Sequence, residues 1–115
     1  MQALIDYIIY DIKQKHINDP AIGHLDNILE IVLLSNRYET GKYINSIIDK
    51  ETYWIVSNHF GYISGQWQDI EFIKLIERKT EEFKGIVEES YYKRFIDNIK
   101  ESIDALDEDV KKDLI

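Results

Sequence analysis

Apolar residues recur at intervals of three and four along almost the whole chain, which is the spacing of helices with one buried face. The alternation typical of strands is absent, and a single proline leaves room for long helices. The pattern predicts helices over residues 4–15, 20–36, 39–49, 50–64, 69–84 and 86–106. It therefore indicates an all-α protein of about six helices.

Short breaks join these helices into three pairs of roughly 35 residues each, a length typical of helical repeats. We expect three antiparallel hairpins, arranged either as a HEAT-like right-handed array or as a compact helical bundle. The length favours a single domain over residues 1–115, with a weakly structured acidic tail at 107–115.

The inner face of most helices follows from the same spacing. On the first helix it predicts Ile5, Ile8, Ile9 and Ile12, on the second Ala21, Leu25, Ile28, Leu29 and Val32, and on the third Tyr43, Ile44, Ile47 and Ile48. The fifth helix would bury Phe72, Ile73, Ile76, Thr80 and Phe83, and the last Tyr92, Phe95, Ile96, Ile99, Ile103 and Leu106.

The segment 53–72 is the richest in aromatic residues. The chain has 4 Phe, 8 Tyr and 2 Trp, and six of these aromatic residues lie in this segment. One apolar stripe at helical spacing consists of Tyr53, Val56, Phe60 and Ile63. A helix that is apolar on most sides is usually buried, so we expect this stripe in the core with Phe60 near its centre. A more polar stripe beside it contains His59 and Tyr62.

Small residues form a strip on the same predicted helix, at Ser57, Gly61 and Ser64 or Gly65. Glycine inside a helix costs about 1 kcal/mol relative to alanine. Gly61 therefore indicates the close approach of a neighbouring helix. Gly65 suits a left-handed C-terminal cap, so we expect the helix to end at residues 64–66.

The chain is acidic, with a formal net charge of −8 and a pI near 4.8. Direct nucleic-acid binding by phosphate neutralisation requires an excess of Lys and Arg and is not expected. A basic protein partner suits this charge better. The absence of cysteine excludes disulfides and thiolate metal sites and fits the cytoplasm. Asp6 and Asp11 interrupt the first apolar run, which argues against a signal peptide, and no run is long enough to span a membrane.

Catalytic and metal-binding patterns are not recognisable. No histidine has a second ligand at helical spacing, and Asp107 with Asp109 lacks the glycine and closing glutamate of a calcium loop. Ser57 and His59 fall on different helix faces, which excludes a nucleophile and base pair. We therefore expect no catalytic, metal-binding or cofactor-binding residue, and no enzymatic activity.

One block has a more specific pattern: Trp54, His59, Phe60 and Trp67 in the spacing W-x4-H-F-x6-W, followed by Asp69-Ile70-Glu71. Together with the size, acidity and helical pattern, it resembles the small HEAT-like immunity proteins of bacterial contact-dependent growth inhibition and polymorphic toxin systems. The resemblance implies a cytoplasmic antitoxin that binds a cognate toxin domain, often a cationic RNase or DNase, in a tight 1:1 complex.

Partner-binding candidates are carboxylates grouped around aromatic residues, because buried aromatic anchors dominate many tight interfaces. The first choice is the set Trp54, His59, Tyr62, Trp67, Asp69 and Glu71, and the second is Asp97, Glu101 and Asp104 on the last helix. Two alternatives stay open. The chain could be a helical adaptor or regulatory subunit with no toxin partner, or an enzyme whose site one sequence does not reveal.

Overall fold

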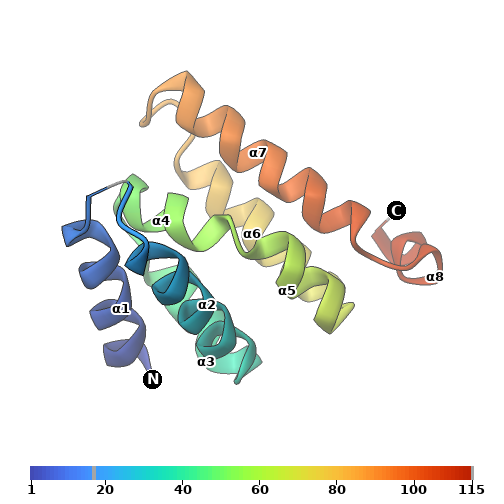
Figure 1. The fold of residues 1–115 in the computed structure, drawn as a ribbon. Coiled ribbons are helices and arrows are strands. Elements are labelled where there is room, and N and C mark those ends of the chain that lie inside the picture. Colours follow the sequence, from blue (N-terminus) through green and yellow to red (C-terminus); the bar gives the residue numbers. More distant parts are fainter. Residues whose placement is uncertain (17, 115) are drawn as a thin grey trace. The chain divides into compact units, whose positions relative to one another are not determined.

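The computed structural model describes residues 1–16 and 18–114, which form eight α-helices and one 3-10 helix with no strand among them (Figure 1). The all-α class is therefore confirmed. The helices are α1 (Gln2–Gln14), α2 (Ala21–Leu34), α3 (Arg37–Ser46), α4 (Lys50–Ser57), α5 (Phe60–Trp67), α6 (Ile70–Glu82), α7 (Glu89–Asp104), α8 (Glu108–Lys111) and the 3-10 helix η1 (Lys112–Leu114). This is two α-helices more than the six predicted, because one predicted helix is divided and the acidic tail is helical.

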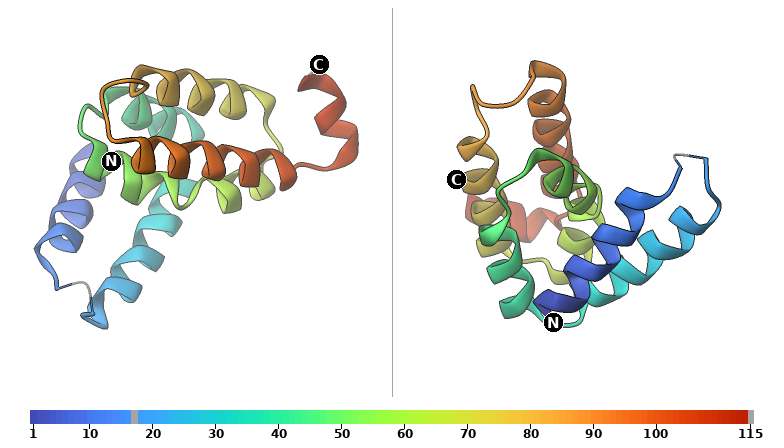
Figure 2. Two further views of the ribbon diagram at one scale, coloured as in Figure 1. Left: turned by 90° about the horizontal axis from the view of Figure 1, so that it is seen from above. Right: turned by 90° about the vertical axis from the view of Figure 1, so that its left-hand side faces the viewer.

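The chain forms two compact units, residues 1–43 and residues 44–115. In the first unit α1 and α2 pack together as a helical hairpin (Figure 2). The four isoleucines predicted on the inner face of α1 are all buried. The hydroxyl of Tyr43 donates a hydrogen bond to Asp6 over 2.9 Å, which ties the end of this unit back to α1. The prediction of one domain over residues 1–115 stays a prediction.

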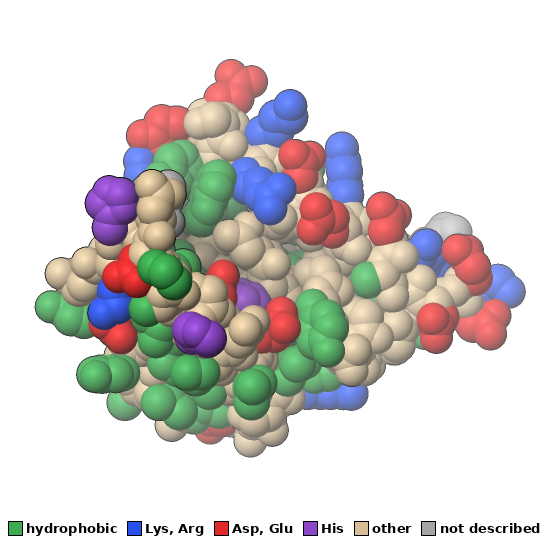
Figure 3. Space-filling view, in the orientation of Figure 1, with side chains coloured by type: hydrophobic (Ala, Val, Ile, Leu, Met, Phe, Trp, Pro, Cys, Tyr) green, Lys and Arg blue, Asp and Glu red, His purple; other side chains and the backbone are tan. Residues whose placement is uncertain are grey.

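The solvent-exposed face of α2 contains large apolar side chains. Leu29 and Leu33 are fully buried, but Ile28 is 48% exposed and Ile31 is 68% exposed. The prediction that Ile28 faces inward is therefore wrong, because burial on α2 follows the Leu29 and Leu33 positions. Ala21, Leu25 and Val32, predicted on the same inner face, are half-buried. Hydrophobic side chains accordingly gather on the surface over α1 and α2 (Figure 3).

In the second unit α7 packs against α4, α5 and α6. Tyr53 lies at the centre of the aromatic core of this unit. The Tyr53 ring stacks on Phe83 at 4.8 Å and meets the edges of Phe95 at 4.8 Å and Phe60 at 5.7 Å. The predicted inward stripes are confirmed on α4 and α5 (Tyr53, Val56, Phe60, Ile63) and on α6 with its C-cap (Phe72, Ile73, Ile76, Thr80, Phe83).

The predicted helix over residues 50–64 is divided at Asn58 and His59. The backbone N–H of His59 donates to the carbonyl of Val56, three residues back, which tightens the turn and ends α4. The second half then continues past Gly65, so the prediction of a cap at Gly65 is wrong. Gln68 takes the left-handed conformation instead, with φ of 52°, and its side-chain amide donates to the Gly65 carbonyl.

Most other helix ends lie close to their predicted places. Asp49 caps α4 and Asp69 caps α6, each accepting a hydrogen bond from a backbone N–H of the first turn. Gly85, with φ of +77°, follows α6. The next helix begins at Glu89 rather than at residue 86. The tail, expected to be weakly structured, contains α8 and η1 within the described residues.

Candidate partner-binding surface

Helices α5 and α7 lie in close contact along a line that we call the α5–α7 seam. A Cβ atom built on Gly61 would lie 3.6 Å from the Cβ of Glu101, and one on Gly65 would lie 3.6 Å from the Cβ of Ala105. The hydroxyl of Ser64 donates to the Ser102 carbonyl over 2.5 Å. The predicted strip of small residues is therefore confirmed as the place where a second helix approaches.

Polar side chains extend the seam toward α4. Asn98, almost fully buried on α7, donates from its amide to the hydroxyl of Ser57 over 2.9 Å. Arg94 donates to the side-chain oxygen of Asn58 over 3.3 Å. The side-chain oxygen of Asn98 accepts no hydrogen bond within the described residues. These contacts fix the register of α7 against the junction of α4 and α5.

Trp54 stands at the α4 end of this surface and is 36% exposed. Its ring meets the edge of Tyr91 with centroids 5.0 Å apart, and the ammonium of Lys50 lies 4.8 Å from the Tyr91 centroid. Lys50 also forms an ion pair with Glu88 at 2.6 Å. Their hydrogen bond raises the pKa of Lys50 and lowers that of Glu88 from the ordinary values. The aromatic pair is thus bordered by charges that neutralise each other.

Three carboxylates lie along the C-terminal half of α7, and we call Asp97, Glu101 and Asp104 the α7 acidic face. They are spaced four and three residues apart, which places them on one side of the helix. None of the three forms an ion pair within the described part of the chain. Glu101 lies against Gly61, and the next residue on α5, Tyr62, is 53% exposed. An aromatic ring and unneutralised carboxylates therefore lie on adjoining helices.

The other residues predicted to bind a partner are partly or fully buried, or already contact neighbouring residues of the chain. His59 is only 6% exposed and offers little surface. Trp67 is half-buried, with its ring on the edge of Phe72 at 5.3 Å. Asp69 caps α6 by accepting from the Glu71 N–H, and the carboxylate of Glu71 lies 3.6 Å from Lys74. Of the first-choice set, Trp54 and Tyr62 are thus the exposed aromatic residues that border α7.

Tyr91 and Arg94 complete this surface, although the sequence pattern did not single them out. Tyr91 lies four residues before Phe95 on the same helix, and that spacing was a usable signal. Arg94 and Asn58 are 36 positions apart in the chain, and neither residue type indicated that their side chains would form a hydrogen bond. Figure 3 shows acidic and basic side chains interspersed over α7 and α8, so the charge at any one place depends on such pairs.

Within the described residues, no group of three or more His, Cys, Asp or Glu side chains is placed to hold a metal ion. No helix in that part of the chain has the length and apolar character to cross a membrane. Comparison of the chain with protein-family models, with curated proteins and with solved structures finds no match.

Proposed function

We propose that this chain is an immunity protein that binds a cognate bacterial toxin domain in a tight 1:1 complex in the cytoplasm and neutralises it. The observation that supports this most is the α7 acidic face, three carboxylates without an ion-pair partner in the described residues, beside the exposed ring of Tyr62. The resemblance to immunity proteins, which rests on the W-x4-H-F-x6-W block, supports a toxin domain as the class of partner.

Charge makes a basic nuclease domain the best-suited partner. A nuclease holds the phosphates of its substrate with Lys and Arg side chains, so its binding cleft presents positive charge. An acidic face complements that surface, speeds the encounter and, when seated on or beside the cleft, excludes the nucleic acid. In this proposal Trp54 and Tyr62 supply the aromatic anchors, and Asp97, Glu101 and Asp104 supply the complementary charge.

The proposal assigns the chain no catalytic step and no cofactor. Trp67, Asp69 and Glu71 remain candidate contacts at the start of α6, secondary to α7 because Asp69 caps the helix and Glu71 has Lys74 within 3.6 Å. We also propose, as the resemblance implies, that the helices form a HEAT-like array.

Co-expression tests the function directly. Genes for immunity proteins of this class lie immediately downstream of the toxin gene, so the C-terminal domain of the upstream reading frame is expressed in a bacterial host with and without this chain. The expected result is growth arrest by the domain alone and normal growth with both. An upstream domain that is harmless, or arrest that this chain does not relieve, would contradict the proposal.

A matched pair of variants tests the surface. Glu101→Lys with Asp104→Lys should lose protection, because it reverses charge on the α7 acidic face. Glu77→Lys with Asp113→Lys changes the net charge equally at exposed positions elsewhere and should protect fully. An adaptor would instead bind a non-toxic partner and protect nothing, which separates the alternative class.

A further inference from the structure

The hairpin of α1 and α2 has a second apolar surface besides the one that it buries. Leu4 and Tyr7 on α1 are 50% and 69% exposed, and Ile28 and Ile31 on α2 are 48% and 68% exposed. We call these four side chains the hairpin patch. The solvent side of a surface helix normally carries polar or charged residues, so four large apolar side chains there require an explanation.

The antiparallel course of the two helices brings the four side chains together (Figure 2). The turn lies midway between Gln14, the end of α1, and Ala21, the start of α2. Residues 4 and 7 of α1 are therefore level with residues 31 and 28 of α2. Figure 3 shows hydrophobic side chains gathered over these two helices.

The helical positions also place the patch on one side of the hairpin. Leu4 precedes the buried Ile5 by one residue, and Ile28 precedes the buried Leu29 by one residue. Each exposed residue is therefore about 100° from a core position of its own helix. Because the two helices run in opposite directions, the same offset turns both side chains toward the same side.

Charged groups lie away from the hairpin patch. Asp6 and Glu30 follow Leu4 and Ile28 by two positions, which is about 200° around each helix. Nearer the turn, Asp11 and Lys15 neutralise each other in an ion pair at 3.1 Å. The whole first unit has four basic and six acidic residues, a net charge of −2, whereas residues 44–115 have a net charge of −6. The patch thus belongs to the less acidic part of the chain.

The size of the patch suits one half of a small dimer interface. At roughly 150–200 Å² for a fully exposed side chain of this size, the four exposed fractions amount to about 350–470 Å². A standard interface buries about 800 Å² on each partner, and about 65% of a homodimer interface is apolar. The patch therefore supplies most of the roughly 500 Å² of apolar surface that each copy of a stable dimer contributes.

We infer that the hairpin patch binds the hairpin patch of a second copy of this chain, so that two hairpins pack face to face about a two-fold axis. α2 is apolar on two sides, at Leu29 and Leu33 and again at Ile28 and Ile31, and such a helix is normally covered on both. A second copy brings an uncharged surface of equal size, and no charge is then buried without a partner.

A basic protein suits this surface less well, because the patch has no carboxylate to pair with its Lys and Arg side chains. None of the four residues belongs to the α7 acidic face. The inference therefore goes beyond the proposed function and does not depend on it, and its test uses the chain alone.

Analytical ultracentrifugation of the full chain over a range of concentrations tests the inference. The mass should rise from 13.7 kDa toward twice that value, with a dissociation constant of about 1–100 µM, as befits a small interface. Raising the salt concentration should tighten the dimer, because it screens the repulsion between two acidic chains. A chain that stays monomeric up to about 500 µM would overturn the inference, and the patch would then belong to another protein or to the second unit of the same chain.

A matched pair of double variants locates the interface. Tyr7→Asp with Ile31→Asp places charge in the patch and should weaken the dimer at least about tenfold. Ile48→Asp with Ile86→Asp adds the same charge at two isoleucines of the second unit, which are 90% and 78% exposed, and should leave the dissociation constant within about twofold. Circular dichroism checks that both variants remain helical. Equal dimerisation by the patch variant and the wild type would overturn the inference.

A dilution series of the ¹⁵N-labelled wild type gives a test that needs no variant. Backbone amide shifts that change with concentration are expected around Leu4, Tyr7, Ile28 and Ile31. Concentration-dependent shifts confined to residues 44–115 would place the interface elsewhere and would likewise overturn the inference.

Discussion

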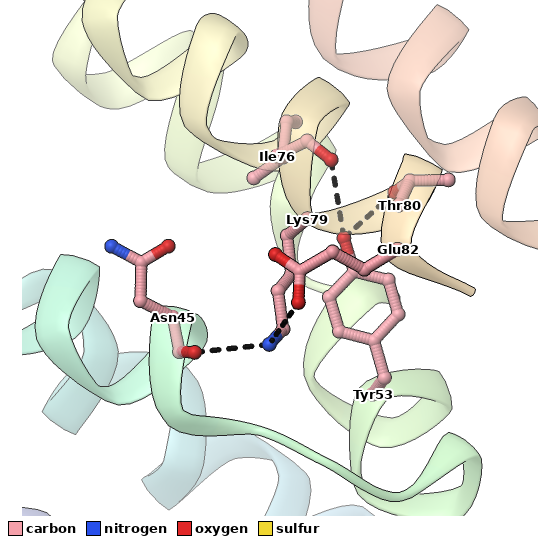
Figure 4. Close-up of polar contacts among 6 residues, drawn as sticks. All are labelled: Asn45, Tyr53, Ile76, Lys79, Thr80 and Glu82. Carbon is pink, nitrogen blue, oxygen red and sulfur yellow. Dashed lines mark hydrogen bonds and ion pairs between the residues drawn. The ribbon is translucent and has the colours of Figure 1, made fainter.

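The hydroxyl of Tyr53 offers a sharp test of how the core of the second unit is held together. It lies 2.7 Å from the hydroxyl of Thr80 and donates to the Ile76 carbonyl at 3.3 Å (Figure 4). Tyr53 and Thr80 are at most 1% exposed, so water cannot replace either partner. Tyr53→Phe keeps the ring contacts with Phe83, Phe95 and Phe60 and removes only the oxygen.

The expected cost of Tyr53→Phe is about 1–3 kcal/mol of unfolding free energy, because the hydroxyl of Thr80 loses a partner in a dry site. Urea unfolding followed by tryptophan fluorescence measures it. Thr80→Val should cost a similar amount. The double variant should cost less than the sum by about 1 kcal/mol, because the two hydroxyls share one hydrogen bond. Additive costs, or a loss below about 0.5 kcal/mol for Tyr53→Phe, would refute the reasoning.

The same hydroxyl makes stability depend on alkaline pH. Burial raises the pKa of Tyr53 well above its ordinary value, since a phenolate would be poorly solvated there. In the unfolded chain the phenol ionises near pH 10. The contribution of the protonated Tyr53 hydroxyl to the free energy of unfolding is therefore fully present below pH 10. Above pH 10 it falls by up to about 1.4 kcal/mol per pH unit. The wild type should lose stability faster than Tyr53→Phe above pH 10, and parallel curves would contradict this.

Three further variants test the packing of the same unit by urea unfolding. Phe60→Ala removes a ring with no exposed surface that contacts Tyr53 and Phe72, and should cost about 3–5 kcal/mol; a loss below about 1 kcal/mol would show that Phe60 is not central. Gly61→Ala should stabilise by up to about 1 kcal/mol, because its Cβ would meet Glu101 at an ordinary contact distance of 3.6 Å, and a loss would contradict the seam geometry. Gly85→Ala should destabilise by about 1 kcal/mol or more, because φ of +77° strains any residue with a Cβ, and a gain would contradict that conformation.

Helical spacing predicted the inner faces best where a helix is regular and its core positions are apolar. The α1 isoleucines and the stripe from Phe72 to Phe83 follow this rule. Ile48 does not, because α3 ends at Ser46 and the spacing no longer applies two residues later. The stripe of α7 was also partly wrong. Asn98 and Ser102 are buried in place of Tyr92, Ile96 and Ile103, which are half-buried.

The α7 error has a physical cause, which also limited the prediction of the site. Asn98 and Ser102 tolerate burial because Asn98 donates to Ser57 and Ser102 donates to the Asn98 carbonyl. Hydrophobicity alone assigns such residues to the surface. The seam could still be anticipated from Gly61, because a helical glycine indicates a close neighbour. Which helix approaches, and that Glu101 would be the residue in contact, required the three-dimensional arrangement.

Titration of a purified toxin domain with this chain tests the central claim most directly. The nuclease activity of the upstream-encoded domain is measured as the chain is added, for the wild type, for Glu101→Lys with Asp104→Lys, and for the control Glu77→Lys with Asp113→Lys. We predict that wild type and control abolish activity at one equivalent. The α7 variant should need at least about tenfold more protein, because steering and complementary charge are lost. Undiminished nuclease activity with excess wild type, or equal inhibition by all three proteins, would contradict the account.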